Sequence, residues 1–279
     1  MKTYLIKITR QIMLVLSLAS IVSCTDDWQE AAEVEVNFTA ALPSEARSRS
    51  YGDGTGVDCL VVGLYDEYKN HLFTQSYPVE NLKVSFQLSL AKNKKYHLIF
   101  WSHNSQNDVY QWDDLTTIRM KKCCYTSWSE AEKADAFYAV MNDFMVNGSD
   151  HNQYISLRRP LAQINVGTTG AVVPATLALH SWPTTFHPLD GTVSGPSTDF
   201  SWSFEGTSTE VFEVENITYQ YLALGYVFAP VVEVMDASLT LMNMNNEHTV
   251  EFPVVKLQAN HRCNVAGNVN PRRKNKIKN

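Results

Sequence analysis

A single proline divides the segment that most constrains the fold of this chain. Residues 154–168 read YISLRRPLAQINVGT, and the apolar residues before Pro160, such as Ile155, occupy odd positions. After the proline they occupy even positions, beginning with Ala162. Each half has the period of two of a strand with one buried and one solvent-exposed face, but the two halves differ in phase. Because proline is tolerated in strands only at edges or bulges, we predict that the chain leaves one sheet at Pro160 and enters another.

The rest of the chain reads mainly as short strands separated by turn-forming residues. Residues 33–41 (EVEVNFTAA) alternate apolar and polar side chains throughout. Further strands are expected at residues 57–65, 82–90, 95–101, 172–179, 192–204, 217–228, 234–242, 248–257 and 262–269. Residues 129–140 are the best candidate for a helix, which we expect to be short. The patterns predict an all-β fold of two tandem sandwiches, one over residues 33–160 and the other over residues 161–270.

The N-terminal residues carry the signals of an exported protein. Residues 1–23 combine a basic start with an apolar run at residues 12–22, the arrangement of a signal peptide. The following Ile-Val-Ser-Cys sequence resembles a bacterial lipobox, which implies cleavage before Cys24 and acylation of its thiol, for example with palmitate. Residues 24–32 then form a tether, whose acidic start resembles the surface-export signal of outer-membrane lipoproteins. The expected location is therefore the cell outer membrane, exposed at the surface; the alternative is an ordinary signal peptide with an incidental Cys24.

The charge of the mature chain argues against nucleic acid as a partner. Removal of residues 1–23 takes away three basic residues and no acidic ones, which leaves 20 basic against 29 acidic residues. Five of those bases lie in residues 271–279, which we expect to be a disordered basic tail. The remaining body then carries a net charge of −14. Such a surface does not favour phosphate backbones.

The sequence contains no recognisable catalytic or metal-binding motif. It has no G-x-S-x-G, P-loop, G-x-G-x-x-G or H-E-x-x-H sequence, so we expect no enzymatic activity, cofactor or metal. An exported chain permits disulfides, and the pairing of four cysteines stays open: Cys59, Cys123, Cys124 and Cys263. Tryptophans suggest a second kind of site, an exposed aromatic platform for glycans made by Trp101, Trp112, Trp128, Trp182 and Trp202. The simpler interpretation places Trp101 and Trp202 in the core.

Six phrases, in this order and behind a lipobox, resemble the fimbrillin-like lipoproteins of the type V pilus system, in a branch whose members are mostly of unassigned function. The phrases cover residues 88–101 (LSLAKNKKYHLIFW), 135–139 (DAFYA), 157–168 (LRRPLAQINVGT), 184–195 (TTFHPLDGTVSG), 221–230 (YLALGYVFAP) and 254–269 (VVKLQANHRCNVAGNV). The resemblance extends over nearly all of the mature chain.

The resemblance implies a fold and a mode of assembly. Members have two transthyretin-like β-sandwich domains in tandem and assemble by donor-strand exchange with other pilin subunits. A protease cuts after an arginine, the N-terminal strand leaves, and a strand of the next subunit replaces it. Here residues 33–41 match the removable strand, and Arg47 or Arg49 matches the cut site. Loss of such a strand exposes unpaired backbone and an apolar stripe, and strand addition satisfies both.

The C-terminal residues differ from those of a stalk subunit. A donated strand alternates apolar residues, whereas residues 270–279 read NPRRKNKIKN. We therefore expect an anchor, accessory or tip subunit with a structural or adhesive role. The alternative is a monomeric surface lipoprotein that binds glycans or host ligands through exposed aromatic residues.

Overall fold

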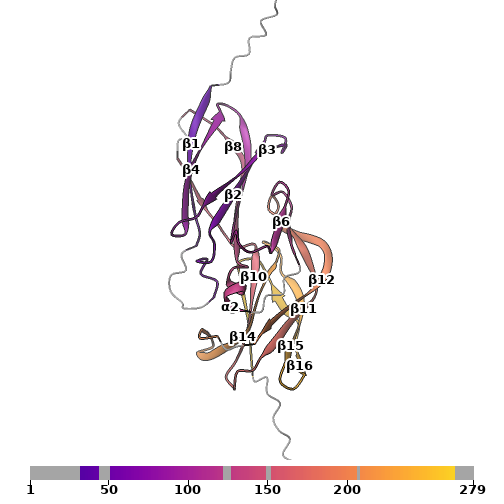
Figure 1. Ribbon diagram of the computed structural model, residues 1–279. Helices are drawn as coiled ribbons and strands as arrows, with labels where there is room; N and C mark the ends of the chain where they lie inside the picture. Colours follow the sequence, from indigo (N-terminus) through magenta and orange to yellow (C-terminus); the bar gives the residue numbers. More distant parts are fainter. Residues whose placement is uncertain (1–31, 44–50, 122–126, 149–151, 206–207, 268–279) are drawn as a thin grey trace, which may run out of the picture. The chain divides into compact units, whose positions relative to one another are not determined.

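The computed structural model describes residues 32–43, 51–121, 127–148, 152–205 and 208–267 (Figure 1). Within these residues the protein is built from β-strands and one short helix, α2 (Trp128–Glu132), so the predicted all-β fold is confirmed. The predicted signal peptide, all but the last residue of the predicted tether and the basic tail lie outside the described residues.

Two sheets share a hydrophobic core in the first half of the chain. The first sheet has the order β4–β1–β9, with bounds Lys83–Ala91, Glu33–Ala41 and Asn152–Ser156. The second has the order β3–β2–β5–β8, with bounds His71–Pro78, Cys59–Asp66, Lys95–His103 and Ala136–Met145. Side chains of both sheets meet in one buried cluster, in which Phe38 and Phe86 come from the first sheet and Leu60 and Phe100 from the second. The two sheets are thus the layers of a sandwich.

Two further sheets contain most of the strands after Pro160. One has the order β13–β14–β10–β18, with bounds Val211–Val214, Ile217–Phe228, Leu161–Thr168 and Arg262–Ala266. The other has the order β16–β15–β11–β7–β6, with bounds His248–Glu251, Met235–Asn243, Ala175–His187, Ile118–Met120 and Tyr110–Trp112. Strand β12 (Thr192–Phe204) pairs with β11, and β17 (Val255–Leu257) pairs with β15. A second buried cluster lies among these strands.

The chain changes sheets where the sequence predicts it. Strand β9 ends at Ser156 in the first sheet, and β10 begins at Leu161 in the third, directly after Pro160. Between them Arg158 forms an isolated bridge with Tyr138 of β8. The division into domains at residues 33–160 and 161–270 stays a prediction. Strands β6 and β7 precede Pro160 in sequence, and β7 pairs with β11.

Strands β2 and β5, in the middle of the second sheet, are buried on both faces, which explains their long apolar runs. In β2, Leu60 and Val62 belong to the first cluster, whereas Val61 and Tyr65 belong to the second. Nearly all residues of β2 and β5 are buried, whereas the edge strand β3 is largely exposed. Strands that are covered on both sides read as continuous hydrophobic segments rather than alternating ones. The strand predicted at residues 57–65 is therefore confirmed as β2, at Cys59–Asp66.

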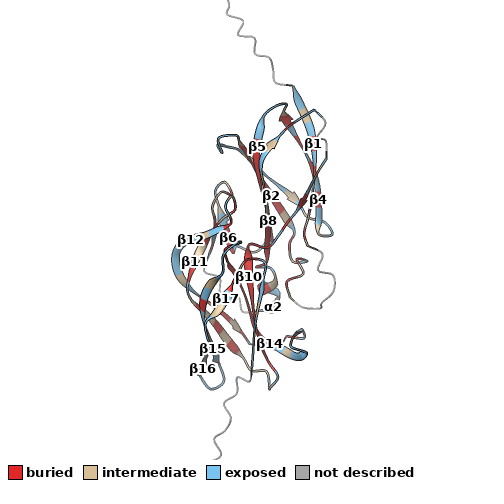
Figure 2. Cartoon of the chain, turned by 180° about the vertical axis from the view of Figure 1, so that it is seen from behind, coloured by how far each residue is buried: buried red, intermediate tan, exposed pale blue. Residues whose placement is uncertain are grey.

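One expectation for the segment after Pro160 is wrong. The period of two predicts a solvent-exposed polar face, but every residue of β10 is buried, including Gln163 and Asn165 (Figure 2). Other segments of the chain cover this face and supply hydrogen-bond partners, as described below. The segment before the proline follows the prediction more closely, because Ile155 is buried and Tyr154 is 83% exposed.

The predicted helix is much shorter than residues 129–140. Helix α2 ends at Glu132, and β8 begins at Ala136. Ser127 caps the helix, since its hydroxyl accepts a hydrogen bond from the backbone N–H of Glu130. From Ala136 the chain pairs with β5, so tertiary pairing overrides the helix propensity of the alanines.

Substitution of Gly225 in β14 tests the packing of the second cluster. A Cβ atom at this position would lie 2.7 Å from the ring of Trp202, which is fully buried and stacked on Phe200. We expect Gly225→Ala to lower the free energy of unfolding by roughly 1–3 kcal/mol in urea denaturation, because the ring cannot move aside without strain. Gly267→Ala is the matched control, because a Cβ atom there meets nothing within 4 Å. Equal stability of the two variants would contradict this packing.

Candidate functional site

Strand β1 occupies the middle of its sheet. On one side residues 37–41 pair in parallel with β9. On the other side Thr39 Oγ1 lies 3.1 Å from Ser85 Oγ, and the backbone N–H of Leu42 donates to the carbonyl oxygen of Leu82. Residue numbers increase along β1 as they decrease along β4 in these two contacts, so β4 is antiparallel to β1. Because β4 and β9 pair with β1 and not with each other, β1 fills the position between them.

The inner face of β1 packs on aromatic side chains. Val36, Phe38 and Ala40 are fully buried, and the alternation predicted for Glu33–Ala41 is confirmed. The ring of Phe38 stacks on Phe86 with centroids 5.3 Å apart, and it meets the edge of Phe144 at 6.0 Å. The central Phe38 therefore contributes the largest apolar contact of the strand.

Loss of β1 would leave a slot between β4 and β9. Neighbouring strands lie about 4.8 Å apart, so β4 and β9 would face each other across about 10 Å. Both edges would present unpaired N–H and C=O groups, and Phe86 and Phe144 would lie uncovered at the bottom of the slot. Such a slot accepts one extended strand with apolar side chains at alternate positions.

The predicted processing residues lie outside the described parts of the chain. Arg47 and Arg49 fall in residues 44–50, and Cys24 falls in residues 1–31. The described chain ends at Pro43, directly after β1, and resumes at Tyr51. The lipid attachment at Cys24 and the cleavage at Arg47 or Arg49 therefore stay predictions.

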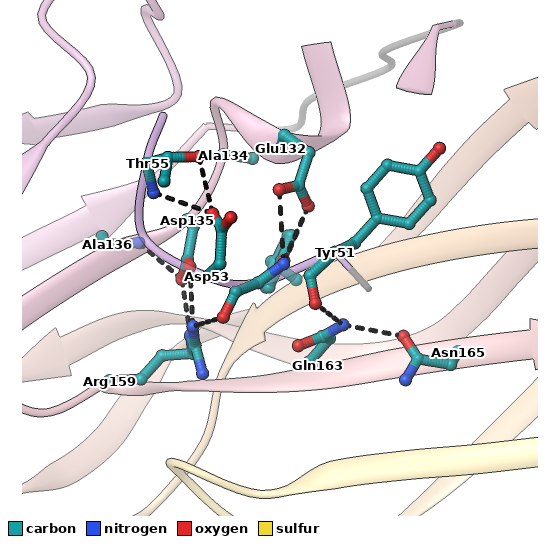
Figure 3. Close-up of polar contacts among 12 residues, drawn as sticks. Tyr51, Asp53, Thr55, Glu132, Ala134, Asp135, Ala136, Arg159, Gln163 and Asn165 are labelled. Carbon is teal, nitrogen blue, oxygen red and sulfur yellow. Dashed lines mark hydrogen bonds and ion pairs between the residues drawn. The ribbon is translucent and has the colours of Figure 1, made fainter. Parts of the chain in front are cut away.

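A buried polar cluster holds the chain immediately after residues 44–50 (Figure 3). The backbone N–H of Gly52 donates to Oε1 and Oε2 of Glu132 at 3.0 and 3.3 Å, and the carbonyl oxygen of Gly52 accepts from Arg159 Nη2 at 2.7 Å. Figure 3 shows Glu132 and Arg159 approaching this stretch of backbone from opposite sides. We call this arrangement the Gly52 cluster, and it consists of Tyr51, Gly52, Glu132, Asp135, Arg159 and Gln163.

A two-point ion pair lies at the centre of the Gly52 cluster. Arg159 Nε lies 2.6 Å from Asp135 Oδ1, and Arg159 Nη2 lies 2.7 Å from Asp135 Oδ2. The side chains of Arg159 and Asp135 are only 7% and 2% exposed. The guanidinium also lies over the ring of Phe137 at 4.8 Å. Removal of one partner from such a buried pair costs about 3–5 kcal/mol, because it leaves the other charge without compensation.

The polar side chains of β10 complete the cluster. Gln163 Nε2 donates to the carbonyl oxygen of Tyr51 at 3.1 Å and to Asn165 Oδ1 at 2.9 Å. Asn165 Nδ2 in turn donates to Asn264 Oδ1 of β18 at 2.7 Å. These contacts explain why the polar face of β10 is buried rather than exposed to solvent.

The side chain of Tyr51 is held from three directions. Its ring stacks on Trp128 of helix α2 with centroids 5.3 Å apart and meets Tyr221 edge-on at 5.1 Å. Its hydroxyl lies 2.5 Å from Ser208 Oγ. Tyr51, the first described residue after residues 44–50, is thus packed between the helix and β14.

Burial raises the pKa of Glu132 from its ordinary value of 4.5 to about 7. The negative charge of Asp135 acts in the same direction, whereas the hydrogen bond from Gly52 acts against the shift. The hydroxyl of Tyr226 also donates to Glu132 Oε1 at 3.3 Å. The carboxyl group therefore changes its protonation state close to neutral pH.

Sequence patterns do not reveal the Gly52 cluster. Its central contact joins Gly52 to Arg159, which lie 107 residues apart. The available local signal is the glycine-rich run at residues 52–56. Gly52 has a φ of +90°, and a Cβ atom there would lie 2.4 Å from Gln163 Oε1, so the position requires glycine.

The predicted aromatic platform does not form as a single surface. Trp101, Trp182 and Trp202 are buried, which confirms the simpler interpretation for Trp101 and Trp202. The indole N–H of Trp182 donates to the carbonyl oxygen of Phe228 at 2.7 Å. Trp112 and Trp128 are partly exposed, and Trp128 belongs to the contacts around Tyr51.

The cysteines with described positions are free thiols. Cys59 in β2 and Cys263 in β18 are partly buried, and burial raises the pKa of both. Cys123 and Cys124 lie outside the described residues, so the predicted pairing stays untested for these two. In the part of the chain that the structure describes, no group of three or more His, Cys, Asp or Glu side chains could hold a metal ion. Among the same residues, no helix has the length and apolar character of a membrane span.

Several solved structures are similar to this chain. The tip fimbrial protein Mfa3 of Porphyromonas gingivalis, with a C-terminal truncation, has a TM-score of 0.47 and 13% identity, and the match covers 80% of this chain and 81% of that chain. The fimbrial anchor protein Mfa2 of the same organism has a TM-score of 0.44 and 15% identity, with 80% and 82% covered. A candidate cell adhesion protein of Bacteroides ovatus has a TM-score of 0.49 and 12% identity, with 84% and 92% covered.

The comparisons by sequence give one family. No curated protein matches the chain. Residues 28–270 match a family that is described as a family of unknown function, DUF6562. Because this match spans most of the 279 residues, the protein belongs to the DUF6562 family.

Proposed function

We propose that this protein is a lipid-anchored cell-surface subunit of a pilus that assembles with other subunits by exchange of strand β1. Cleavage after Arg47 or Arg49 separates β1 from the body. A strand of another subunit then enters the slot between β4 and β9.

The observation that carries the proposal is the contrast between the two sides of residues 44–50. Before them, β1 is held by strand pairing and by the packing of Phe38, contacts that another strand of similar pattern can restore. After them, Tyr51 and Gly52 are held by the buried Arg159–Asp135 pair and by Glu132. A cut between the two therefore frees a replaceable strand, while the segment that begins at Tyr51 stays anchored in the body.

The proposed position in the assembly is that of an anchor, accessory or tip subunit. The basic residues 270–279 lack the alternating apolar pattern of a donated strand, so we do not expect this segment to act as one. The proposed partners are other pilin subunits, the outer membrane through acylated Cys24, and a host or glycan ligand.

Strand exchange predicts a specific response to trypsin. For the chain that begins at Thr25, we expect the first cut after Arg47 or Arg49. The cut protein should then bind a labelled peptide of residues 32–43, measured by fluorescence anisotropy, whereas the uncut protein should not. A peptide with Phe38→Asp should bind at least about 100-fold more weakly, because it places a carboxylate at a fully buried position.

The matched control places the same carboxylate on the exposed face. A peptide with Asn37→Asp should bind within a few-fold of the parent peptide, since residue 37 faces solvent. Cleaved protein that binds neither peptide, or that binds the Phe38→Asp and Asn37→Asp peptides equally, would contradict the proposal.

The raised pKa of Glu132 predicts how stability changes with pH. Between pH 4.5 and about 7 the folded protein retains a proton on Glu132 that the unfolded chain has lost. This group therefore stabilises the fold below that window, and its contribution falls as the pH rises through it. Glu132→Gln should remove this dependence and make the protein more stable than the parent at pH 8, with little difference at pH 4.5. Thermal unfolding at both pH values measures the effect, and Glu130→Gln on the exposed side of the helix is the control. An identical change of stability with pH in the parent and in Glu132→Gln would refute the prediction.

Lipid anchoring is tested in cells. Cys24→Ala should abolish incorporation of labelled palmitate, because it removes the thiol that the lipobox presents. Treatment of intact cells with protease should digest the parent protein from the surface. Unchanged palmitate incorporation in Cys24→Ala would show that the anchor is elsewhere.

A further inference from the structure

The hairpin of β6 and β7 carries a cavity that strand exchange does not use. The cavity has a volume of about 250 Å³, and its lining includes Gln111, Trp112, Asp113, Asp114 and Arg119. Sites for drug-sized ligands are larger, about 300–1,000 Å³, so this cavity suits a single small ring.

The loop between the two strands has a fixed shape. Leu115 adopts a φ of +66°, which is unusual for a residue other than glycine, and its side chain is fully buried in the second cluster. Asp114 Oδ1 accepts hydrogen bonds from the backbone N–H and the hydroxyl of Thr116 at 3.0 and 2.7 Å. Backbone strain that is held by surrounding contacts is characteristic of binding sites, because it presents side chains in one arrangement.

The aromatic wall of the cavity is also fixed. Trp112 is partly exposed, and its ring meets His103 edge-on with centroids 4.8 Å apart and lies 6.4 Å from Trp101. Burial lowers the pKa of His103 to about 4, so the group behind Trp112 is neutral above pH 5. Neighbouring rings thus pack against the indole of Trp112, and their charge does not change near neutral pH.

Three exposed polar side chains lie beside Trp112 in the lining of the cavity. Gln111 and Arg119 lie opposite each other in the pairing of β6 with β7, and both are exposed. Neither they nor the exposed Asp113 forms a side-chain hydrogen bond or ion pair with the residues that the structure describes. The cavity therefore offers hydrogen-bond donors, a carboxylate acceptor and an aromatic face within one hairpin.

We propose that this cavity binds one neutral or amino-bearing sugar ring of a glycan. The C–H face of a pyranose ring packs on Trp112, and its hydroxyl groups both donate to Asp113 and accept from Gln111 and Arg119. The two carboxylates outnumber the single guanidinium, so a sugar that carries a carboxylate is repelled. The site lies on a different part of the chain from β1, and its occupation is independent of strand exchange.

Saturation-transfer NMR with five probes tests this proposal: methyl glucoside, methyl galactoside, N-acetylglucosamine, glucosamine and glucuronic acid. We expect transfer to at least one neutral or amino sugar, with a Kd of about 1 mM, and none to glucuronic acid. Trp112→Leu and Asp113→Asn should each weaken binding at least about tenfold, because each removes one of the two kinds of contact.

Matched variants separate loss of the site from general effects. Trp128→Phe and Asp143→Asn, which change the same residue types away from the cavity, should bind like the parent. Circular dichroism identifies any variant that fails to fold. Because Asp113 is exposed, Asp113→Asn should fold and tests the site even if Trp112→Leu does not fold. Transfer to none of the probes, transfer to glucuronic acid alone, or binding that Asp113→Asn leaves unchanged would each overturn the proposal.

Discussion

The guanidinium of Arg159 joins parts of the chain that are distant in sequence. It pairs with Asp135 ahead of β8 and donates to the carbonyl oxygen of Gly52, while its own backbone lies between β9 and β10. Because the charge of Arg159 is buried, Asp135 and the Gly52 carbonyl oxygen are both needed to compensate for its lost hydration. The path of the chain after residues 44–50 and its change of sheet at Pro160 are therefore linked through one side chain.

The contacts that hold the chain before residues 44–50 therefore differ in kind from the contacts that hold it after them. Strand β1 contributes backbone hydrogen bonds and the apolar side chains of Val36, Phe38 and Ala40, and any strand with that pattern supplies the same contacts. The segment at Tyr51 and Gly52 depends on a specific ion pair, a specific carboxyl group and a glycine with positive φ. Another strand can therefore replace the contacts of β1, but it cannot replace those of Tyr51 and Gly52.

Local sequence patterns predicted the elements that depend on the period of side chains. The alternation of Glu33–Ala41 and the change of phase at Pro160 both appear in the structure as expected. The same period was misleading for β10, because it shows which side chains share a face but not which distant segment covers that face. Tyr51 and Asn264 bury the polar side of β10, and neither contact has a local signature. The helix prediction was too long for a related reason, since β5 draws Ala136 and its successors into a sheet.

Hydrogen exchange on the protein after cleavage and removal of β1 measures whether β1 is a replaceable strand. Amide protection should fall in β4 and β9, which lose their shared neighbour, and should be restored when a strand with the pattern of residues 33–41 is added. Strands β10 and β14, beside the Gly52 cluster, should keep their protection throughout. Loss of protection across all four strands, or unchanged protection of β4 and β9, would contradict the division into a replaceable strand and a stably folded body.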